Sequence, residues 1–361
     1  NQPVDNGEAG GNISFDWYGQ ELNQKVWHTT VDNISYDLAA DLKRKHIYST
    51  SWGGSLRRFN YEEENKKWEV IPLPMDYQDS LFCGEINVNE YYLNPVDPPD
   101  GSHNHKAFSV YVEIDTIWVG TAGGVNKGII QTDGCINWIH FDTDNGLGGN
   151  WVIGIIPQTF NSFIRLWMIS WIAPNTPHPL TFTDDGGKSW NNVTQLQDID
   201  IVVYNLSFSD ENILASTSHG LYVSDINDGV FWNLLPIISD LTGEVLLTET
   251  VYSSIKLVDY DILYIGTNDG ISIMSTSGVT LENIRFWEKS SPFSAYPNPF
   301  LINDDNQVGI DGYVRFLYSN PNNEIGSIDI FDFSMDKVAQ LTNSYMVNND
   351  EREAIWNGRN E

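Results

Sequence analysis

The sequence predicts an all-β fold, and three observations support that prediction. Turn residues are abundant, with 29 Gly and 15 Pro, and so are the strand formers Trp (13), Tyr (17) and Phe (16). A hydrophobic fraction of 41% is enough for a buried core despite the high charge. A short apolar phrase that ends in Ser or Thr recurs along the chain. The length of 361 residues indicates two domains, or one large domain with an appendage.

The recurring phrase sets the organisation of most of the chain. It reads apolar, aromatic, any residue, small, then Ser or Thr, with a Gly two or three residues later; the third copy lacks this Gly. Its five copies end at Ser51, Thr121, Ser170, Thr217 and Thr267, at intervals of 70, 49, 47 and 50 residues. A Trp follows each copy: Trp68, Trp138, Trp190, Trp232 and Trp287. A period near 48 with about four short strands per unit is the spacing of a β-propeller blade.

Each part of the phrase has a predicted role in the blade. The alternating residues form a strand, the small residue lets neighbouring blades approach, and the Gly forms the following turn. The later Trp packs between blades, and the long first interval holds a turn-rich surface insertion at 94–101. We count five blades and expect the segment 13–17 to complete the last blade and close the ring. Six or seven blades are expected if the natural chain has more sequence at its N-terminus.

The segment Thr183-Asp184-Asp185-Gly186-Gly187-Lys188-Ser189-Trp190 resembles the Asp-box of sialidase-type propellers. In that motif the Asp carboxylate and the hydroxyl group cap backbone N–H groups of a tight turn. The resemblance implies a structural role, not a catalytic one, for Thr183, Asp185, Gly187, Ser189 and Trp190. The segment 141–152 is similar to the inter-blade phrase of two-component-regulator-type propellers, where an Asn-Gly-Leu stretch leads into a Val-rich strand.

The C-terminal segment resembles a flagellar-hook-capping-type immunoglobulin-like domain. The matching segments are 296–300 (Tyr-Pro-Asn-Pro-Phe), three strands at 314–318, 328–332 and 338–341, and a late turn at 356–360. Where the family has a Gly after Ile-Phe-Asp, this sequence has Asp336. The family continues with a further strand, whereas this sequence stops at Glu361, so we expect an incomplete sandwich over 294–361 after a propeller over 1–290. Such domains end the cargo of type IX secretion, which implies a secreted or cell-surface protein of a Gram-negative-type bacterium.

The charge limits the partners that the chain can take. Asp and Glu number 49 against 19 Lys and Arg, which gives a formal net charge of −30. Nucleic acids and anionic membranes attract basic surfaces, so neither is the expected partner of this acidic chain. No apolar run is long enough to span a bilayer. A protein or a polysaccharide at the cell exterior is the expected partner.

Catalytic and metal-binding residues are weakly indicated. The few Arg residues of the propeller do not stand in the context that sialidases need, and 49 acidic residues make carboxylate pairs uninformative. His103 and His105 would lie on one face of a strand, beside Asp100, and could hold a transition metal. Asp142 and Asp144 resemble half of a calcium loop, although an inter-blade turn is favoured. No cofactor is established, and calcium remains a hypothesis.

The sequence therefore favours a non-catalytic binding or assembly protein. The alternative is an extracellular glycoside hydrolase or glycan-binding protein of the Asp-box type. Four Trp residues lie off the repeat and are candidates for the binding face: Trp17, Trp27, Trp52 and Trp171. Two interpretations stay open for Cys83 and Cys135, because they either pair in an oxidising compartment or remain separate buried side chains.

Overall fold

The computed structural model describes residues 12–25, 34–64, 68–87, 91, 93–94, 101–160, 162–171, 179–197, 201–209, 211–226, 228–241, 243–285, 293–297, 300, 312–320, 322, 325–348 and 350–359. The chain folds as two compact units, Asn1–Val203 and Tyr204–Glu361. None of the helices within the described ranges has the length and apolarity needed to cross a membrane.

Each copy of the phrase lies on the second strand of an antiparallel sheet of four strands, or of five in blade 2, which confirms the all-β fold of blade-like repeats. Blade 1 consists of β3 (Ser35–Asp41), β4 (His46–Ser51), β5 (Ser55–Asn60) and β6 (Trp68–Ile71). Blade 2 consists of β8 (Ala107–Glu113), β9 (Thr116–Thr121), β10 (Val125–Ile130) and β11 (Ile136–Phe141), with β7 (Ser80–Leu81) added beside β11. Blade 3 consists of β12 (Val152–Thr159), β13 (Ile164–Ser170), β14 (Leu180–Thr183) and β15 (Asn191–Asn192).

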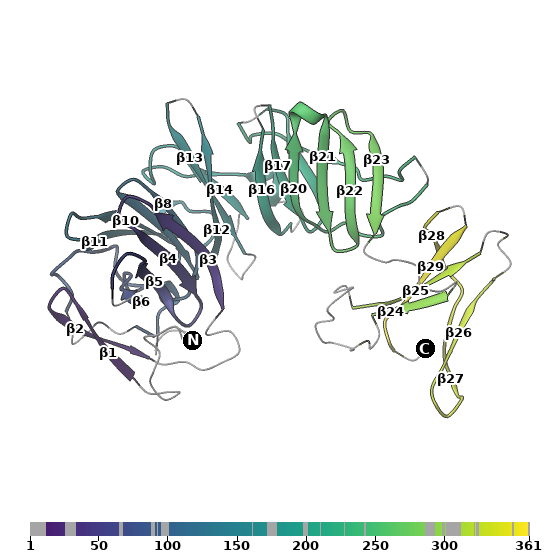
Figure 1. Cartoon of the computed structure of the whole chain (residues 1–361), viewed down its shortest axis with the longest axis horizontal. Helices are drawn as coiled ribbons and strands as arrows, with labels where there is room; N and C mark the ends of the chain where they lie inside the picture. The colour runs from purple at the N-terminus through teal and green to yellow at the C-terminus, as the bar shows by residue number, and fades with distance from the viewer. Residues whose placement is uncertain are drawn as a thin grey trace. The chain divides into compact units, whose positions relative to one another are not determined.

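The second unit holds the next two sheets. Blade 4 consists of β16 (Val203–Phe208), β17 (Ile213–Thr217), β18 (Gly220–Ser224) and β19 (Trp232–Leu235). Blade 5 consists of β20 (Val251–Leu257), β21 (Ile262–Thr267), β22 (Gly270–Ser275) and β23 (Thr280–Arg285), whose strands run side by side in chain order (Figure 1). The short helical turns of the described chain are η1 (His103–His105), η2 (Thr143–Asn145), α1 (Thr194–Gln197) and η3 (Val258–Tyr260).

The hydroxyl group at the end of the phrase explains why the phrase recurs. In three copies it donates a hydrogen bond to the carbonyl oxygen of a Gly three residues later: Thr121 to Gly124 (3.1 Å), Thr217 to Gly220 (2.7 Å) and Thr267 to Gly270 (2.9 Å). In blade 1 the Ser51 hydroxyl accepts from the backbone N–H of Gly54 at 2.8 Å. The side chain thus satisfies the backbone of the turn between the second and third strands, where Ser and Thr are favoured.

The small residue of the phrase marks a close approach between blades. A Cβ atom on Gly120 would lie 2.5 Å from the backbone oxygen of Val152, the first residue of blade 3. Any side chain at this position would force blades 2 and 3 apart, because real Cβ atoms do not come so close. The Trp that follows the phrase is fully buried in blades 2 and 4, as Trp138 and Trp232, while Trp68 and Trp190 are partly buried and Trp287 lies outside the described residues.

The segment expected to close the ring forms a separate hairpin instead. β1 (Asn12–Trp17) pairs with β2 (Gln20–Lys25) alone, so the prediction that it completes the last blade is wrong. The hairpin packs on blades 1 and 2: Trp17 and Leu22 join their core, and the Tyr18 hydroxyl donates to the carbonyl oxygen of Asp133 at 2.9 Å. Burial of these apolar side chains stabilises the hairpin in this position.

Among the described residues, three apolar clusters pack between neighbouring blades. The first joins blades 1 and 2 around Tyr48, Ile117 and Trp138. The second joins blades 2 and 3 around Trp118, Val152 and Met168. The third joins blades 4 and 5 through Leu214, Leu221, Val251, Leu263, Ile265 and Met274.

The C-terminal strands form two sheets. One contains β24 (Phe293–Tyr296), β25 (Val314–Ser319), β29 (Glu351–Trp356) and β28 (Tyr345–Met346), in that order. The other is the hairpin of β26 (Ile328–Phe331) and β27 (Lys337–Leu341), which Figure 1 shows projecting from the first sheet. These strands belong to the same compact unit as blades 4 and 5, and the domain limits 1–290 and 294–361 stay a prediction.

The turn of this hairpin corrects one detail of the sequence analysis. Met335 has φ 67°, whereas Asp336 is absent from the residues with positive φ. The residue that adopts the glycine-like conformation is therefore Met335, one position earlier than expected.

Candidate functional site

The residues of segment 183–190, which resembles an Asp-box, form a closed, hydrogen-bonded turn. The carboxylate of Asp185 accepts from the Ser189 N–H at 2.9 Å and from the Ser189 hydroxyl at 2.6 Å. The Thr183 hydroxyl donates to Asp185 at 3.0 Å and accepts from the Gly187 N–H at 2.9 Å. Hydrogen bonds from Ser189, and then from Thr183 and Lys188, lower the pKa of Asp185 to about 2. All of these groups are used within the turn, and Trp190 packs against Phe141 in the core between blades 2 and 3.

Asp142 and Asp144 lie in the turn between blades 2 and 3. Asp142 caps η2, since its carboxylate accepts from the Asp144 N–H at 2.9 Å. The Asn145 side chain accepts in return from the Asp142 N–H at 3.0 Å, which completes a capping box. The Asp142 carboxylate thus holds the turn together, and a calcium role stays a prediction.

His103 and His105 do not lie on a strand. They stand two positions apart in the 3₁₀ turn η1, where about 120° separates successive side chains, so the expectation that the two rings share a strand face is wrong. His105 is buried, and its Nδ1 atom lies 3.3 Å from the backbone nitrogen of Asn94. Burial lowers the pKa of His105 to about 4. His103 Nδ1 lies 3.2 Å from Nζ of Lys106, and Asp100 is outside the described residues.

Within the part of the chain that the structure describes, no three His, Cys, Asp or Glu side chains are grouped so that they could hold a metal ion.

The four Trp candidates have different environments. Trp17 is only 5% exposed in the core of the first unit, so its ring is not available to a partner. Trp52 is partly buried, with Nζ of Lys106 5.7 Å from its ring centre. Trp171 is 41% exposed and keeps its place as a binding candidate. Trp27 lies outside the described residues.

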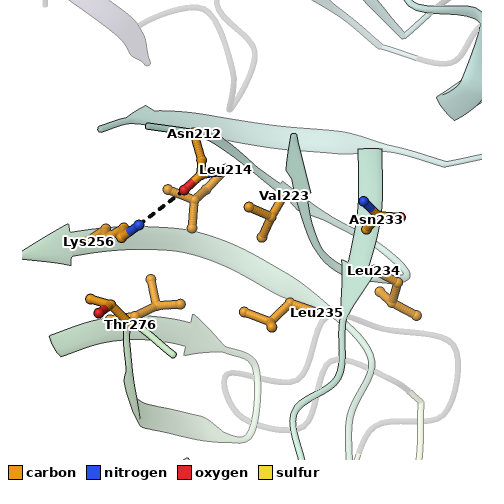
Figure 2. Close-up of a pocket in the computed structure, with 9 residues that line it drawn as sticks. Asn212, Leu214, Val223, Asn233, Leu234, Leu235, Lys256 and Thr276 are labelled. Carbon is orange, nitrogen blue, oxygen red and sulfur yellow. Dashed lines mark hydrogen bonds between the residues drawn. The ribbon is translucent and has the colours of Figure 1, made fainter. Parts of the chain in front are cut away.

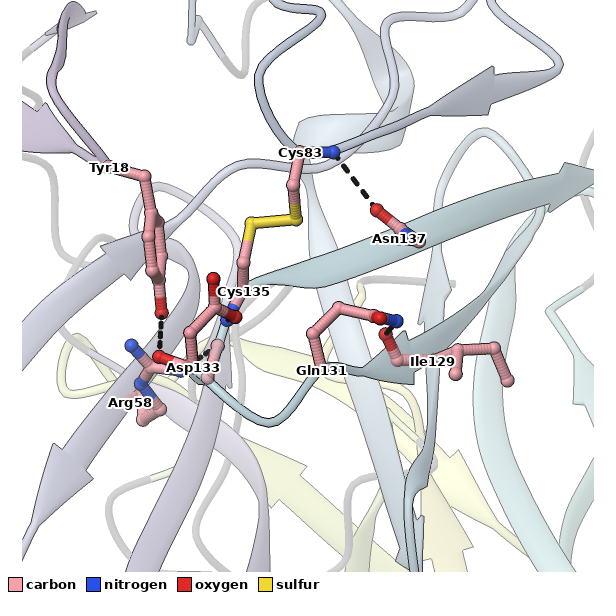
Figure 3. Close-up of a disulfide and its surroundings, with 9 residues drawn as sticks. Tyr18, Arg58, Cys83, Ile129, Gln131, Asp133, Cys135 and Asn137 are labelled. Atoms are coloured by element: carbon pink, nitrogen blue, oxygen red, sulfur yellow. Dashed lines mark hydrogen bonds between the residues drawn. A yellow bond between two sulfur atoms is a disulfide. The ribbon is translucent and has the colours of Figure 1, made fainter.

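The two cysteines form a disulfide. Cys83, just after β7, is bonded to Cys135, whose Cα lies 6.2 Å away at the start of β11 (Figure 3). The Cys83 N–H also donates to the side chain of Asn137 at 3.0 Å. The sequence left two interpretations open, and the structure supports the one in which the two cysteines pair.

One position of the repeat distinguishes blade 5 from the others. Three residues before the Ser or Thr of the phrase stand Tyr48, Trp118, Trp167, Leu214 and Tyr264. The first four are at most 3% exposed, whereas Tyr264 is 36% exposed. The same structural position is therefore buried in blades 1 to 4 and open in blade 5.

The residues around Tyr264 extend this exposure across the sheet. Ile255 pairs with Tyr264, and Ile271 pairs with both Gly266 and Ile284, so these side chains share one face. We call Ile255, Tyr264, Ile271 and Ile284 the open face of blade 5. The corresponding residues of blade 4, Leu214, Leu221 and Leu235, pack in the cluster that joins blade 4 to blade 5. This face was not predicted from the sequence. The available signal is that Tyr264 belongs to the last copy of the phrase, so no further copy follows to cover it.

A pocket of about 140 Å³ lies between blades 4 and 5 (Figure 2). Its apolar walls come from β17, β18, β19 and β21: Leu214, Val223, Leu234, Leu235 and Leu263. Lys256 of β20 adds a positive charge, and its Nζ atom donates to the Asn212 side chain at 3.1 Å and to the Glu211 carboxylate at 3.0 Å. Asn233 and Thr276 complete the polar part of the lining. The pocket is thus an apolar hollow beside a Lys256–Glu211 ion pair, and it was not predicted from the sequence.

The pKa of one carboxyl group of the second unit, that of Glu244, is raised, which is the direction required of a general acid. Burial raises the pKa of Glu244, in spite of the opposing charge of Arg285.

No protein-family model and no curated protein matches this chain. A chain of a nidogen/laminin complex is 14% identical with a TM-score of 0.41, over 70% of this chain and 81% of that one. The extracellular domain of BT4673 from B. thetaiotaomicron is 13% identical with a TM-score of 0.37; the match covers 95% of this chain and only about half, 49%, of that one. Virginiamycin B lyase from Staphylococcus aureus is 12% identical with a TM-score of 0.41, over 90% of this chain and 96% of that one. At TM-scores below 0.5 these similarities assign no family and no function.

Proposed function

We propose that this chain is a non-catalytic binding and assembly protein of the cell exterior. The observation that carries the proposal is the open face of blade 5, on which Tyr264 is exposed while its four counterparts are buried. Contiguous exposed apolar side chains of this kind mark interaction sites on soluble proteins.

The chemistry of the partner follows from the equivalent face of blade 4. Leu214, Leu221 and Leu235 receive the aliphatic side chains of the next sheet, Leu263, Ile265 and Met274. The open face carries aliphatic and aromatic residues at the same positions, so it suits a protein that presents an apolar β-sheet. Each large apolar side chain that such a contact buries contributes about 1.5–3 kcal/mol.

An exterior location agrees with the disulfide between Cys83 and Cys135, because disulfides persist in oxidising compartments. We extend this to secretion or surface display by a Gram-negative-type bacterium through the type IX route, which the C-terminal resemblance implies. The net charge of −30 favours a basic partner, or an acidic partner bridged by divalent cations such as calcium.

The test compares three forms of the chain as bait for envelope proteins of the source cells. The double variant Tyr264→Lys/Ile271→Lys places two charges on the open face. The control Ile129→Lys changes a similarly exposed Ile on β10, in the other unit. We expect the wild type and the control to recover one protein in stoichiometric amount, and the double variant to lose it. Equal recovery by all three forms would contradict the proposal.

The alternative is an extracellular glycoside hydrolase, and the raised pKa of Glu244 is the observation that favours it. The wild type and Glu244→Gln are incubated with a panel of polysaccharides and generic aryl glycosides. Turnover that disappears in Glu244→Gln would replace the binding function by the enzymatic one. We expect no turnover by either protein.

A further inference from the structure

We propose that the pocket between blades 4 and 5 binds an organic ammonium ion, whose hydrocarbon part fills the apolar hollow while its charged end faces an acidic rim. The proposal goes beyond the binding function of the open face and does not depend on it. Leu263 and Lys256, which pair with each other beside the pocket, alternate along their strands with Tyr264 and Ile255 of the open face. The pocket and the open face therefore lie on opposite faces of blade 5.

The hollow has room for a small hydrocarbon and opens to solvent. Its volume is about 140 Å³, and an engineered protein cavity of about 150 Å³ lined by Leu, Ile and Phe binds benzene. Leu214 and Leu263 are 1% and 4% exposed, so they close the hollow from inside. Leu234 is 53% exposed, so the hollow is open on its side. A ligand can therefore place an apolar part inside and keep a polar end at the rim.

The positive charge in the pocket wall is already neutralised. Nζ of Lys256 lies 3.0 Å from the Glu211 carboxylate and 3.1 Å from the side-chain oxygen of Asn212 (Figure 2). The Lys256 side chain is 9% exposed, whereas that of Glu211 is 70% exposed. An anionic ligand would have to compete with Glu211 for this ammonium group, and it would meet the same carboxylate as a repulsive neighbour.

Two more carboxylates stand at the rim, and each is held by a residue that lines the pocket. The Asp261 carboxylate accepts from the backbone N–H of Thr276 at 3.2 Å and from its hydroxyl group. The Asp225 carboxylate accepts from the side-chain amide of Asn233. Figure 2 shows Thr276 and Asn233 on opposite sides of the apolar side chains. These donors are uncharged, so the contacts fix both carboxylates in place without balancing their charge.

This combination of walls and rim selects an organic cation. Together with Glu211, the rim holds three carboxylates against the one ammonium group of Lys256, so it attracts a positive group and repels a negative one. A metal ion is not favoured, because the walls are aliphatic and the described residues include no three His, Cys, Asp or Glu side chains grouped to hold one. An ammonium group needs no such set, since it donates hydrogen bonds to separate carboxylates.

The test is methyl NMR of the full chain with labelled Leu and Val side chains. The probe is benzylammonium, while benzyl alcohol and benzoate carry the same ring with no charge and with a negative charge. We expect benzylammonium to shift the methyl signals of Val223 and Leu263, which line the pocket, and to leave those of Val152 and Leu166 in the other unit unchanged. It should bind about fivefold tighter than benzyl alcohol, as an exposed charge pair allows, and benzoate should bind more weakly than the alcohol.

Variants at the rim separate the role of charge from that of the hollow. The double variant Asp225→Asn/Asp261→Asn keeps the acceptor oxygens that bond to the lining residues but removes both negative charges. It should bind benzyl alcohol as the wild type does, and benzylammonium no tighter than the alcohol. The control Glu249→Gln removes an exposed carboxylate before the start of β20, whereas Lys256 lies near the end of that strand; this control should keep the preference for the cation.

Different outcomes would overturn different parts of the proposal. No shift of the Val223 and Leu263 methyl signals with benzylammonium would mean that the hollow binds no ligand of this class. Equal or tighter binding of benzoate would make Lys256 the recognition group. A preference for benzylammonium that survives in the double variant would place the cation away from the rim. Methylammonium has the charge without the ring, and binding as tight as that of benzylammonium would show that the apolar walls play no part.

Discussion

Arg285 at the end of blade 5 and Glu353 on β29 form a buried ion pair, in which Nη2 of the arginine lies 2.7 Å from Oε2 of the glutamate. Asp269 binds the same Nη2 atom at 2.8 Å, and Arg315 binds the other oxygen of Glu353 at 2.6 Å. All four side chains are at most 7% exposed. The cluster links the last blade to the C-terminal sheet, so both should respond to the loss of either partner.

Replacing Glu353 by Gln is therefore expected to destabilise the second unit by about 3–5 kcal/mol, because the variant leaves two buried arginines with one carboxylate fewer. Urea unfolding of the full chain measures the change. As a control, Lys337→Met removes an exposed pair with Asp329 at 3.6 Å and should cost less than about 1 kcal/mol. Equal effects of the two changes would mean that the cluster is solvated in solution.

Removal of the disulfide should destabilise the first unit. The bond closes a loop between residues separated by 52 positions, for which loop entropy alone gives about 4 kcal/mol. We expect dithiothreitol, or the double variant Cys83→Ser/Cys135→Ser, to lower the melting temperature of the first unit. A melting temperature that is the same with and without reductant would show that the cysteines are unpaired in solution.

The turn at 183–190 should make a pH-dependent contribution to stability through Asp185. Its pKa in the folded chain is about 2, below its ordinary value of 3.8. The ionised carboxylate therefore stabilises the fold above pH 4, and this stabilisation disappears as the pH falls through 2. Asp185→Asn should melt earlier than the wild type at pH 7 and together with it near pH 2. Glu64→Gln, at an exposed position, serves as the control, and a gap between Asp185→Asn and the wild type that stays constant with pH would contradict the assignment.

Truncation to Ala at two equivalent positions of the repeat should lower the free energy of unfolding by different amounts. Leu214→Ala opens a cavity in the cluster between blades 4 and 5 and should cost about 2–5 kcal/mol. Tyr264→Ala, at the same position of blade 5, should cost only about 1 kcal/mol, because this side chain is partly exposed and leaves no closed cavity. Urea unfolding of both variants compares the two costs. A similar cost for both would mean that the open face is covered in solution.

Local chemistry explains what could be predicted. The phrase that ends in Thr267 forms a strand because its apolar residues alternate, and it forms a turn because the Thr267 hydroxyl bonds to Gly270. Both features depend only on residues a few positions apart. The same holds for the turn at Asp185. Predictions that needed a distant partner were less secure. The segment ending at Trp17 was assigned to the last blade, whereas an apolar core formed with blades 1 and 2 holds it.

The sequence by itself determined the all-β class and the five copies of a four-stranded unit, because hydrophobic alternation and turn chemistry are encoded in neighbouring residues. A family resemblance added three strands of the C-terminal segment, which correspond to β25, β26 and β27. Only the tertiary structure decided that Cys83 meets Cys135, that Tyr264 is exposed where Leu214 is buried, and that an apolar pocket forms beside Lys256. Each of these depends on which sheet packs on which, and side chains from separate strands create that arrangement only when the whole unit has folded.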